Sequence, residues 1–262
     1  MKALLIYNKE DYGKNKEYVN WIIDTAKKKG ITMDLVFKDE LLLQGVKLND
    51  NISFVINRTR CYEVSLIFEL NNIRVFNNSM ITLIGNNKLA CYNYAKNIGY
   101  KFPKIFISWD DKQKIISKPN FGHGGFGIGM LNEINLNDGT YRFQQKLVEN
   151  LVGDIRFFVI GNKIIHAVLR KQPKGKIISN FSQGGDIELY HYNDLEKDYV
   201  QKFISDLNID YAGVDFLLTH SGELIFNEIE DVVGSRMLSS LGLNDTTDLY
   251  MDHILNITNN NY

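Results

Sequence analysis

A glycine-dense loop beside a lysine carries the residues of this chain that could handle phosphate. Five glycines stand within eight positions, at Gly122, Gly124, Gly125, Gly127 and Gly129, and Lys118 lies just upstream. Glycine lets backbone N–H groups come close to an anion, and lysine adds a compact positive charge. A glycine hairpin without a ligand is the alternative, which this density of glycine beside a lysine disfavours. The sequence therefore predicts a phosphate-binding loop.

Two known nucleotide motifs are close to this loop, and neither fits it. The spacing Gly122-x-Gly124-x-x-Gly127 matches the dinucleotide-binding fingerprint, which needs a helix directly after its last glycine. Residues 128–131 have the pattern of a strand instead. A P-loop would end in Gly-Lys-Ser or Gly-Lys-Thr, and that ending is absent. We therefore interpret residues 122–129 as a hairpin flap.

Three carboxylates near the C-terminal end form a second group of residues that could do chemistry. Asp215 lies inside an apolar run, and Glu228 and Glu230 are two positions apart in the segment that returns after a turn. Residues two apart on a strand face the same side, so a hairpin can gather all three carboxylates. Clustered like charges are costly unless a cation joins them, and oxygen ligands suit Mg²⁺ or Mn²⁺. The pattern predicts a metal site.

Composition and charge narrow the class of protein. The 262 residues are 44% hydrophobic and 23% charged, which is typical of a soluble globular protein, and the net charge is -1. This charge gives no electrostatic reason to expect nucleic acid or an anionic membrane as a partner. No apolar run is long enough for a signal peptide or a membrane span. The two cysteines have no metal-ligand spacing, so we expect a cytoplasmic protein, and the number of copies that assemble stays open.

The order of predicted elements divides the chain into three parts. Strands over 2–7, 31–37, 52–56 and 73–76 alternate with helices, which favours a parallel sheet. A helix over 87–98 follows, and from residue 104 the strands have an antiparallel pattern, with a two-residue hairpin signal at Gly161-Asn162. The expected fold is α/β followed by α+β. The expected domains are an N-terminal α/β domain over 1–84, a small lobe with the flap over 85–148, and a C-terminal lobe with the metal site over 149–262.

An ordered set of short motifs links these parts. They are Asn87-Lys88, Gly99 to Pro103, Lys118-Pro119 before the flap, Gln145 to Val148, Gly153 to Arg156, Asn180 with Gly184-Gly185, Ala212 to Asp215, and Glu228-Ile229-Glu230. In this order the chain resembles the ATP-grasp superfamily, and most closely its RimK-like branch of ribosomal-protein glutamate ligases and related ligases. The resemblance covers about two thirds of the chain.

The resemblance implies an ATP-grasp fold in which two α+β lobes hold ATP between them. The implied nucleotide contacts are Lys88 and Lys118 on the phosphates, the flap glycines Gly122, Gly124, Gly125 and Gly127, Gln145, Lys146, Leu147 and Val148 along the adenine edge, Asp154 on the ribose, and Asn180. Asp215, Glu228 and Glu230 would hold Mg²⁺ or Mn²⁺. ATP and a small-molecule or peptide carboxylate and amine are the implied partners.

The chain departs from the pattern of that branch at three positions. Glu230 stands where the family usually has asparagine, and Lys146 stands where the branch has an acidic residue. Ile178 replaces an arginine. The phosphate charge would then need Arg156, Arg170 or a nearby lysine such as Lys171 or Lys176. Arg170 and Arg236 are the candidates for contacting the substrate carboxylate and its acyl phosphate.

The reaction implied by the resemblance joins a carboxylate to an amine. The carboxylate attacks the γ-phosphate to give an acyl phosphate and ADP, and the amine then displaces phosphate. Such chemistry depends on positioning and charge neutralisation, which basic side chains and a metal supply. Two alternatives stay open: an ATP-binding accessory or regulatory protein without ligase activity, and a small-molecule kinase with the same fold.

Overall fold

The structure is a computed structural model that describes residues 1–44, 51–108, 113–171 and 186–260. The first four strands, β1 (Lys2–Tyr7), β2 (Thr32–Phe37), β3 (Phe54–Asn57) and β4 (Arg74–Phe76), form a parallel sheet in the order β2-β1-β3-β4. Leu4 and Leu5 of β1 are both buried, and they belong to apolar clusters on opposite faces of the sheet. This burial of both faces explains the continuous apolar run of β1. The α/β beginning that the sequence predicts is confirmed.

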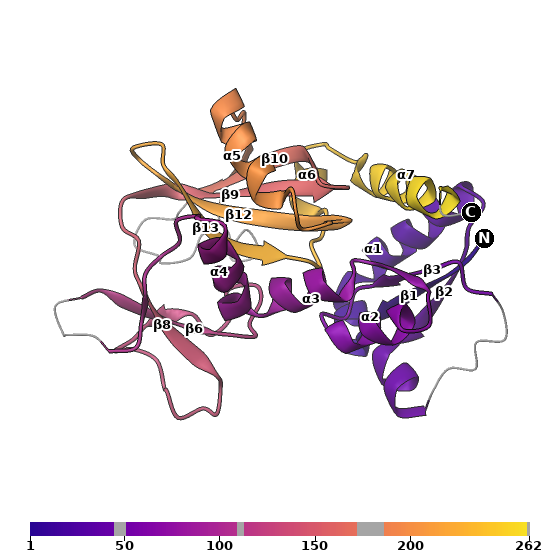
Figure 1. Ribbon diagram of the computed structural model, residues 1–262, viewed down its shortest axis with the longest axis horizontal. Helices are drawn as coiled ribbons and strands as arrows, with labels where there is room; N and C mark the ends of the chain where they lie inside the picture. The colour runs from indigo at the N-terminus through magenta and orange to yellow at the C-terminus, as the bar shows by residue number, and fades with distance from the viewer. Residues whose placement is uncertain (45–50, 109–112, 172–185, 261–262) are drawn as a thin grey trace.

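Helices from both ends of the chain cover this sheet. The connecting elements are α1 (Lys9–Lys28), the short π-helix η1 (Glu40–Gln44), α2 (Tyr62–Glu69) and α3 (Ser79–Asn86). The C-terminal helix α7 (Thr246–Asn259) returns to pack beside α1 (Figure 1). Met251 and Ile254 of α7 share a buried cluster with Ile22 of α1. Within the described residues, no helix combines the length and the apolar character that a membrane crossing needs.

A five-stranded antiparallel sheet forms the centre of the molecule. Its strands are β9 (Leu151–Ile160), β10 (Lys163–Lys171), β11 (Ile187–Leu189), β12 (Tyr211–Thr219) and β13 (Leu224–Glu230), in the order β11-β10-β9-β12-β13. Phe157 packs in the cluster that contains residues of α4 (Lys88–Asn97) and α5 (Asp194–Ile204), whereas Phe158 packs in the cluster shared with α7. Gly161 and Asn162 both have φ of 57°, which gives the predicted two-residue hairpin between β9 and β10.

A second antiparallel sheet carries the glycine loop. Its strands β5 (Ile105–Phe106), β6 (Ile115–Pro119), β7 (Gly129–Met130) and β8 (Arg142–Lys146) lie in the order β5-β8-β6-β7. We call this sheet together with α4 the flap lobe. The loop connects β6 to β7, which pair antiparallel, so the hairpin interpretation is confirmed and no helix follows Gly127. The remaining helix of the described chain, α6 (Arg236–Ser240), follows β13.

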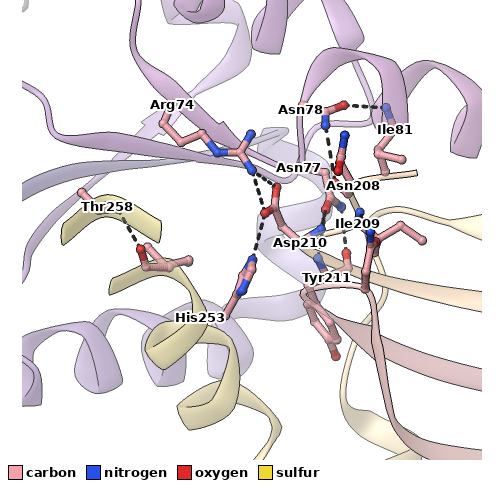
Figure 2. A network of polar contacts seen from close by, with 12 residues as sticks. Arg74, Asn77, Asn78, Ile81, Asn208, Ile209, Asp210, Tyr211, His253 and Thr258 are labelled. Atoms are coloured by element: carbon pink, nitrogen blue, oxygen red, sulfur yellow. Dashed lines mark hydrogen bonds and ion pairs between the residues drawn. The ribbon is translucent and has the colours of Figure 1, made fainter. Parts of the chain in front are cut away.

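A buried polar network joins the N-terminal sheet to the central sheet (Figure 2). Asp210, just before β12, accepts hydrogen bonds from Arg74 of β4 at 2.7 and 2.8 Å, and its Oδ1 lies 2.9 Å from His253 Nε2 of α7. The Asn77 side chain donates to the carbonyl of Tyr211 at 2.7 Å and accepts from the backbone N–H of both Asp210 and Tyr211. Side chains of β4 and α7 thus fix the first residues of β12.

Candidate active site

A cavity lies between the flap lobe and the central sheet, with an empty volume of about 820 Å³. Its lining includes eleven of the residues singled out from the sequence: Lys88, Lys118, Gly122, Gly125, Gln145, Lys146, Leu147, Val148, Asp154, Arg170 and Glu228. These residues come from α4, β6, the flap, the end of β8, β9, β10 and β13. Its mixed polar and apolar lining suits a ligand that has both an apolar part and charged groups.

Two buried lysines, Lys88 and Lys118, line this cavity, and each contacts a polar side chain of β13. Lys88 begins α4, where the Asn87 side chain caps the helix by accepting from Ala90 N at 3.0 Å. Lys88 Nζ lies 2.5 Å from Glu228 Oε2, and Lys118 Nζ donates to Asn227 Oδ1 at 3.2 Å. Burial and the charge of Lys88 lower the pKa of Lys118 to about 8, although Glu228 opposes this shift. Lys88 thus has a carboxylate partner, whereas Lys118 contacts a neutral amide, and a phosphate would supply Lys118 with a counter-charge.

A β-bulge decides which side chains of β13 enter the cavity. Glu228 is paired with Asp215 and Phe226 with Phe216, so Asn227 is the extra residue of the bulge. As a result, Asn227 and Glu228 both line the cavity. Glu230 lines a different cavity and is paired with Arg156. Sequence reasoning missed Asn227, because a period of two does not allow for a bulge. It expected Glu228 and Glu230 to act together, but Glu228 pairs with Lys88 and Glu230 pairs with Arg156.

A network of buried charges lies on the neighbouring strands. Arg156 of β9 donates from Nε and Nη2 to Asp215 of β12 at 2.7 and 2.6 Å. Arg170 of β10 donates to Asp215 at 2.5 Å and also pairs with Asp154 of β9. Burial raises the pKa of Asp154 even though Arg170 favours its charged form. Two of these contacts are cross-strand pairs, since Asp215 lies opposite Arg156 and Asp154 lies opposite Arg170, whereas the contact from Arg170 to Asp215 reaches across β9.

The three carboxylates predicted as metal ligands each have a basic partner in the described structure. Across residues 1–44, 51–108, 113–171 and 186–260, no group of three or more histidine, cysteine, aspartate or glutamate side chains could hold a metal ion. The physical reason is that Asp215, Glu228 and Glu230 are each paired with arginine or lysine. The oxygen donors that face the cavity from β13 are those of Glu228 and Asn227. They fit Mg²⁺ that arrives with a nucleotide, since Mg²⁺ commonly takes one or two protein carboxylates together with phosphates.

The remaining sequence-predicted residues lie outside the cavity lining. Gly124 and Gly127 belong to the flap and have φ of 64° and 71°, in the left-handed region that favours glycine. Arg156 is buried in the charge network, and Arg236 is exposed at the start of α6, where it lines a second cavity. Asn180 and Lys176 lie outside the described residues. The second cavity is also lined by Arg58 and Arg60, which sequence reasoning missed.

Comparison with known proteins agrees with this arrangement. Residues 134–251 match the family described as the RimK-like ATP-grasp domain. An uncharacterized protein of Mycoplasma genitalium is 27% identical over 255 residues, which cover 92% of this chain and 87% of the relative. A probable alpha-L-glutamate ligase of Nitrosococcus oceani is 31% identical over 87 residues, 33% of this chain and 29% of the relative.

Structural similarity extends over the whole chain. The D-alanine–D-alanine ligase of Bacillus anthracis complexed with ATP superposes with a TM-score of 0.72 at 13% identity, and the match covers 100% of both chains. Identity this low supports a conclusion about the fold alone, and the family match adds the branch. The resemblance predicted from the motifs is confirmed: the chain has the ATP-grasp fold, and its residues 134–251 match the RimK-like ATP-grasp domain.

Proposed function

We propose that this protein is an ATP-dependent ligase that joins a carboxylate to an amine through an acyl phosphate. The observation that carries the proposal is the pair of buried lysines, Lys88 and Lys118, in a cavity that glycines of the flap also line. The alpha-L-glutamate ligase and D-alanine–D-alanine ligase among its relatives support this reaction class.

An unpartnered polar atom at the cavity supports a bound nucleotide. Arg170 Nε is buried and has no hydrogen-bond partner in the described part of the chain, and the buried Gln145 side chain has the Tyr92 hydroxyl beside it. Arg170 and Gln145 both line the cavity. Buried polar groups normally find partners, so a ligand that accepts hydrogen bonds would satisfy Arg170 Nε. We assign Gln145 and residues 146–148 to the adenine edge and Arg170 to a phosphate oxygen.

The residues of this chain would then act by neutralising and positioning charge. Lys88 and Lys118 would draw electron density from the phosphate oxygens while the substrate carboxylate attacks the γ-phosphorus and ADP leaves. The flap would exclude water, which protects an acyl phosphate from hydrolysis until the amine attacks its carbonyl carbon. Mg²⁺ bound through Glu228 and Asn227 would supply further charge neutralisation. Arg156 is a positioning residue, because its guanidinium is taken up by Asp215 and Glu230.

Phosphate release tests the proposal. Purified protein with ATP and Mg²⁺ should release phosphate only when both an acid and an amine are supplied, and Lys118→Met should slow that release about a hundredfold. Lys197→Met is the matched control, since Lys197 is exposed on α5. Phosphate release that needs no amine and yields a stable phosphorylated product would identify a kinase instead.

One observation favours a second candidate, an ATP-binding protein without ligase activity. Asp215, which the family resemblance assigns to the metal, is fully buried and bound by Arg156 and Arg170. Tight binding of ATP without turnover across a broad panel of amino acids and peptides would support this candidate.

A further inference from the structure

A second cavity, with an empty volume of about 1120 Å³, opens at the carboxyl end of the N-terminal sheet. Tyr7 ends β1, Arg58 follows β3, and both line this cavity. In the order β2-β1-β3-β4, the chain leaves β1 toward β2 on one side and reaches β3 on the other. Parallel sheets bind ligands outside the carboxyl ends of the strands at such a switch point. The position of the cavity thus agrees with a binding role.

Arg58 is the built element of this cavity. The side chain is only 5% exposed, its Nε donates to Tyr7 Oη at 3.1 Å, and its Nη2 donates to the carbonyl of Val233 at 2.9 Å. The guanidinium carbon also lies 5.2 Å from the centre of the Tyr18 ring. Among the described residues, Nη1 has no hydrogen-bond partner and no carboxylate pairs with Arg58. A buried, oriented guanidinium without a counter-ion is costly unless a ligand supplies the anion.

The other charges of the cavity leave it positive. Five basic and three acidic side chains line it. Arg60 is paired with Asp11 at 2.8 Å, and Lys14 is paired with Glu10 at 2.7 Å. Arg236, at the start of α6, also lines the cavity, is exposed and forms no ion pair within the described chain. Arg58 and Arg236 are therefore two cations from different parts of the fold that face one space without carboxylate partners.

We propose that this cavity holds a carboxylate of the substrate that is not consumed in the reaction, with Arg58 and Arg236 as its donors. The proposal rests on the proposed ligase function. Glu230 lines this cavity and Glu228 lines the nucleotide cavity, two positions apart on β13. Two residues of a strand span about 7 Å. A substrate of amino-acid or dipeptide size, anchored by one carboxylate here, can thus present its reacting group beside the nucleotide.

Binding measured without nucleotide tests this site. Calorimetric titrations with succinate, L-glutamate and inorganic phosphate would be run on the wild type, Arg236→Gln, Arg58→Lys and the control Lys197→Gln. We expect a dicarboxylate to bind more tightly than phosphate, and each arginine variant to weaken it roughly tenfold to hundredfold. The control should bind like the wild type. The affinity of Arg236→Gln for a non-hydrolysable ATP analogue should stay within about twofold of wild type, because that ligand occupies the other cavity.

Three results would overturn the proposal: no carboxylate binding at millimolar concentrations, equal binding by Arg236→Gln and the wild type, or preference for phosphate. Arg236 is exposed, so its variant stays informative even if Arg58→Lys fails to fold. Failure of the ligase proposal is recognised separately, as absence of ATP binding or of phosphate release in a protein that still binds the dicarboxylate.

Discussion

Arg156 crosses Gly213 so closely that a β-carbon on the glycine would lie 2.9 Å from Cδ and 3.1 Å from Nε of the arginine. The same β-carbon would lie 3.1 Å from Val233 Cγ2. Only a glycine at position 213 leaves room for Arg156 of β9 to reach Asp215 of β12 and Glu230 of β13. The glycine of the Ala212 to Asp215 motif is thus a packing requirement of the charge network.

Replacement of Gly213 by alanine should break this network. We expect Gly213→Ala to displace Arg156 from Asp215 and to lower the free energy of unfolding by about 2–4 kcal/mol, as measured by chemical denaturation. Gly13→Ala is the control, because a β-carbon at Gly13 in α1 meets nothing within 4 Å. A stability of Gly213→Ala equal to wild type would contradict the observed packing.

Nucleotide affinity should fall as the pH rises above about 8. Burial lowers the pKa of Lys118 to about 8. The side chain is therefore mostly protonated at neutral pH and loses its positive charge as the pH rises above about 8. The dissociation constant of a non-hydrolysable ATP analogue should then increase up to about tenfold per pH unit, while Lys118→Arg, which keeps its charge, should flatten the curve. Measurements from pH 6.5 to 9.5 check this. Parallel curves for the two proteins would show that Lys118 is not the titrating group.

Valine in the flap should impair turnover much more than folding. Gly124 and Gly125 have φ of 64° and 74°, and a β-carbon at Gly124 would meet the Phe126 ring at 3.3 Å. The double variant Gly124→Val, Gly125→Val should lose most phosphate release with little change in thermal stability. Gly139→Val is the control, since Gly139 has a similar φ of 74° in open space away from the cavity. Equal loss of turnover and stability would reject the role of the flap as a lid.

The sequence predicted the elements and the flap well, because their signals are local. The apolar run of β9 and the turn at Gly161-Asn162 are visible within about ten residues. The bulge at Asn227 depends on how β13 aligns with β12. The pairing of Asp215 with Arg156 and Arg170 depends on β9 lying beside β12 and on β10 lying on the far side of β9. Arg58 could be connected with a binding site only from the strand order of the first sheet. Contacts set by strand order are therefore the part that local pattern could not supply.

The free energy of unfolding should decrease as the pH rises from about 4 to about 6, because Asp231 loses its proton over this range. Burial raises the pKa of Asp231 from 3.8 to about 6, against the hydrogen bond from Asn86. The folded protein therefore binds the proton of Asp231 more tightly than the unfolded chain does. The stabilisation that this proton provides is complete below pH 4 and is lost as the pH passes 6. Asp231→Asn should remove the effect, so its stability relative to wild type should increase over this range in denaturation experiments. A constant difference from pH 4 to 8 would argue against it.

Loss of the charge on Asp210 should destabilise the protein. Asp210 is 3% exposed and pairs with both Arg74 and His253. We expect Asp210→Asn to reduce the free energy of unfolding by about 2–3 kcal/mol, below the full cost of a buried pair because Arg74 is partly exposed. Glu10→Gln, which removes an exposed pair with Lys14, should have no measurable effect. Equal effects of the two variants would contradict the buried role of Asp210.

The network around Asp210 also bears on the order in which substrates bind. Arg74 and His253 join β4 and α7 to the start of β12, and none of the described flap residues lines the second cavity. The nucleotide cavity, in contrast, has the flap as one of its walls. An acid held at Arg58 then meets a site that exists before ATP arrives, and initial-rate kinetics should show that binding of the acid does not require ATP.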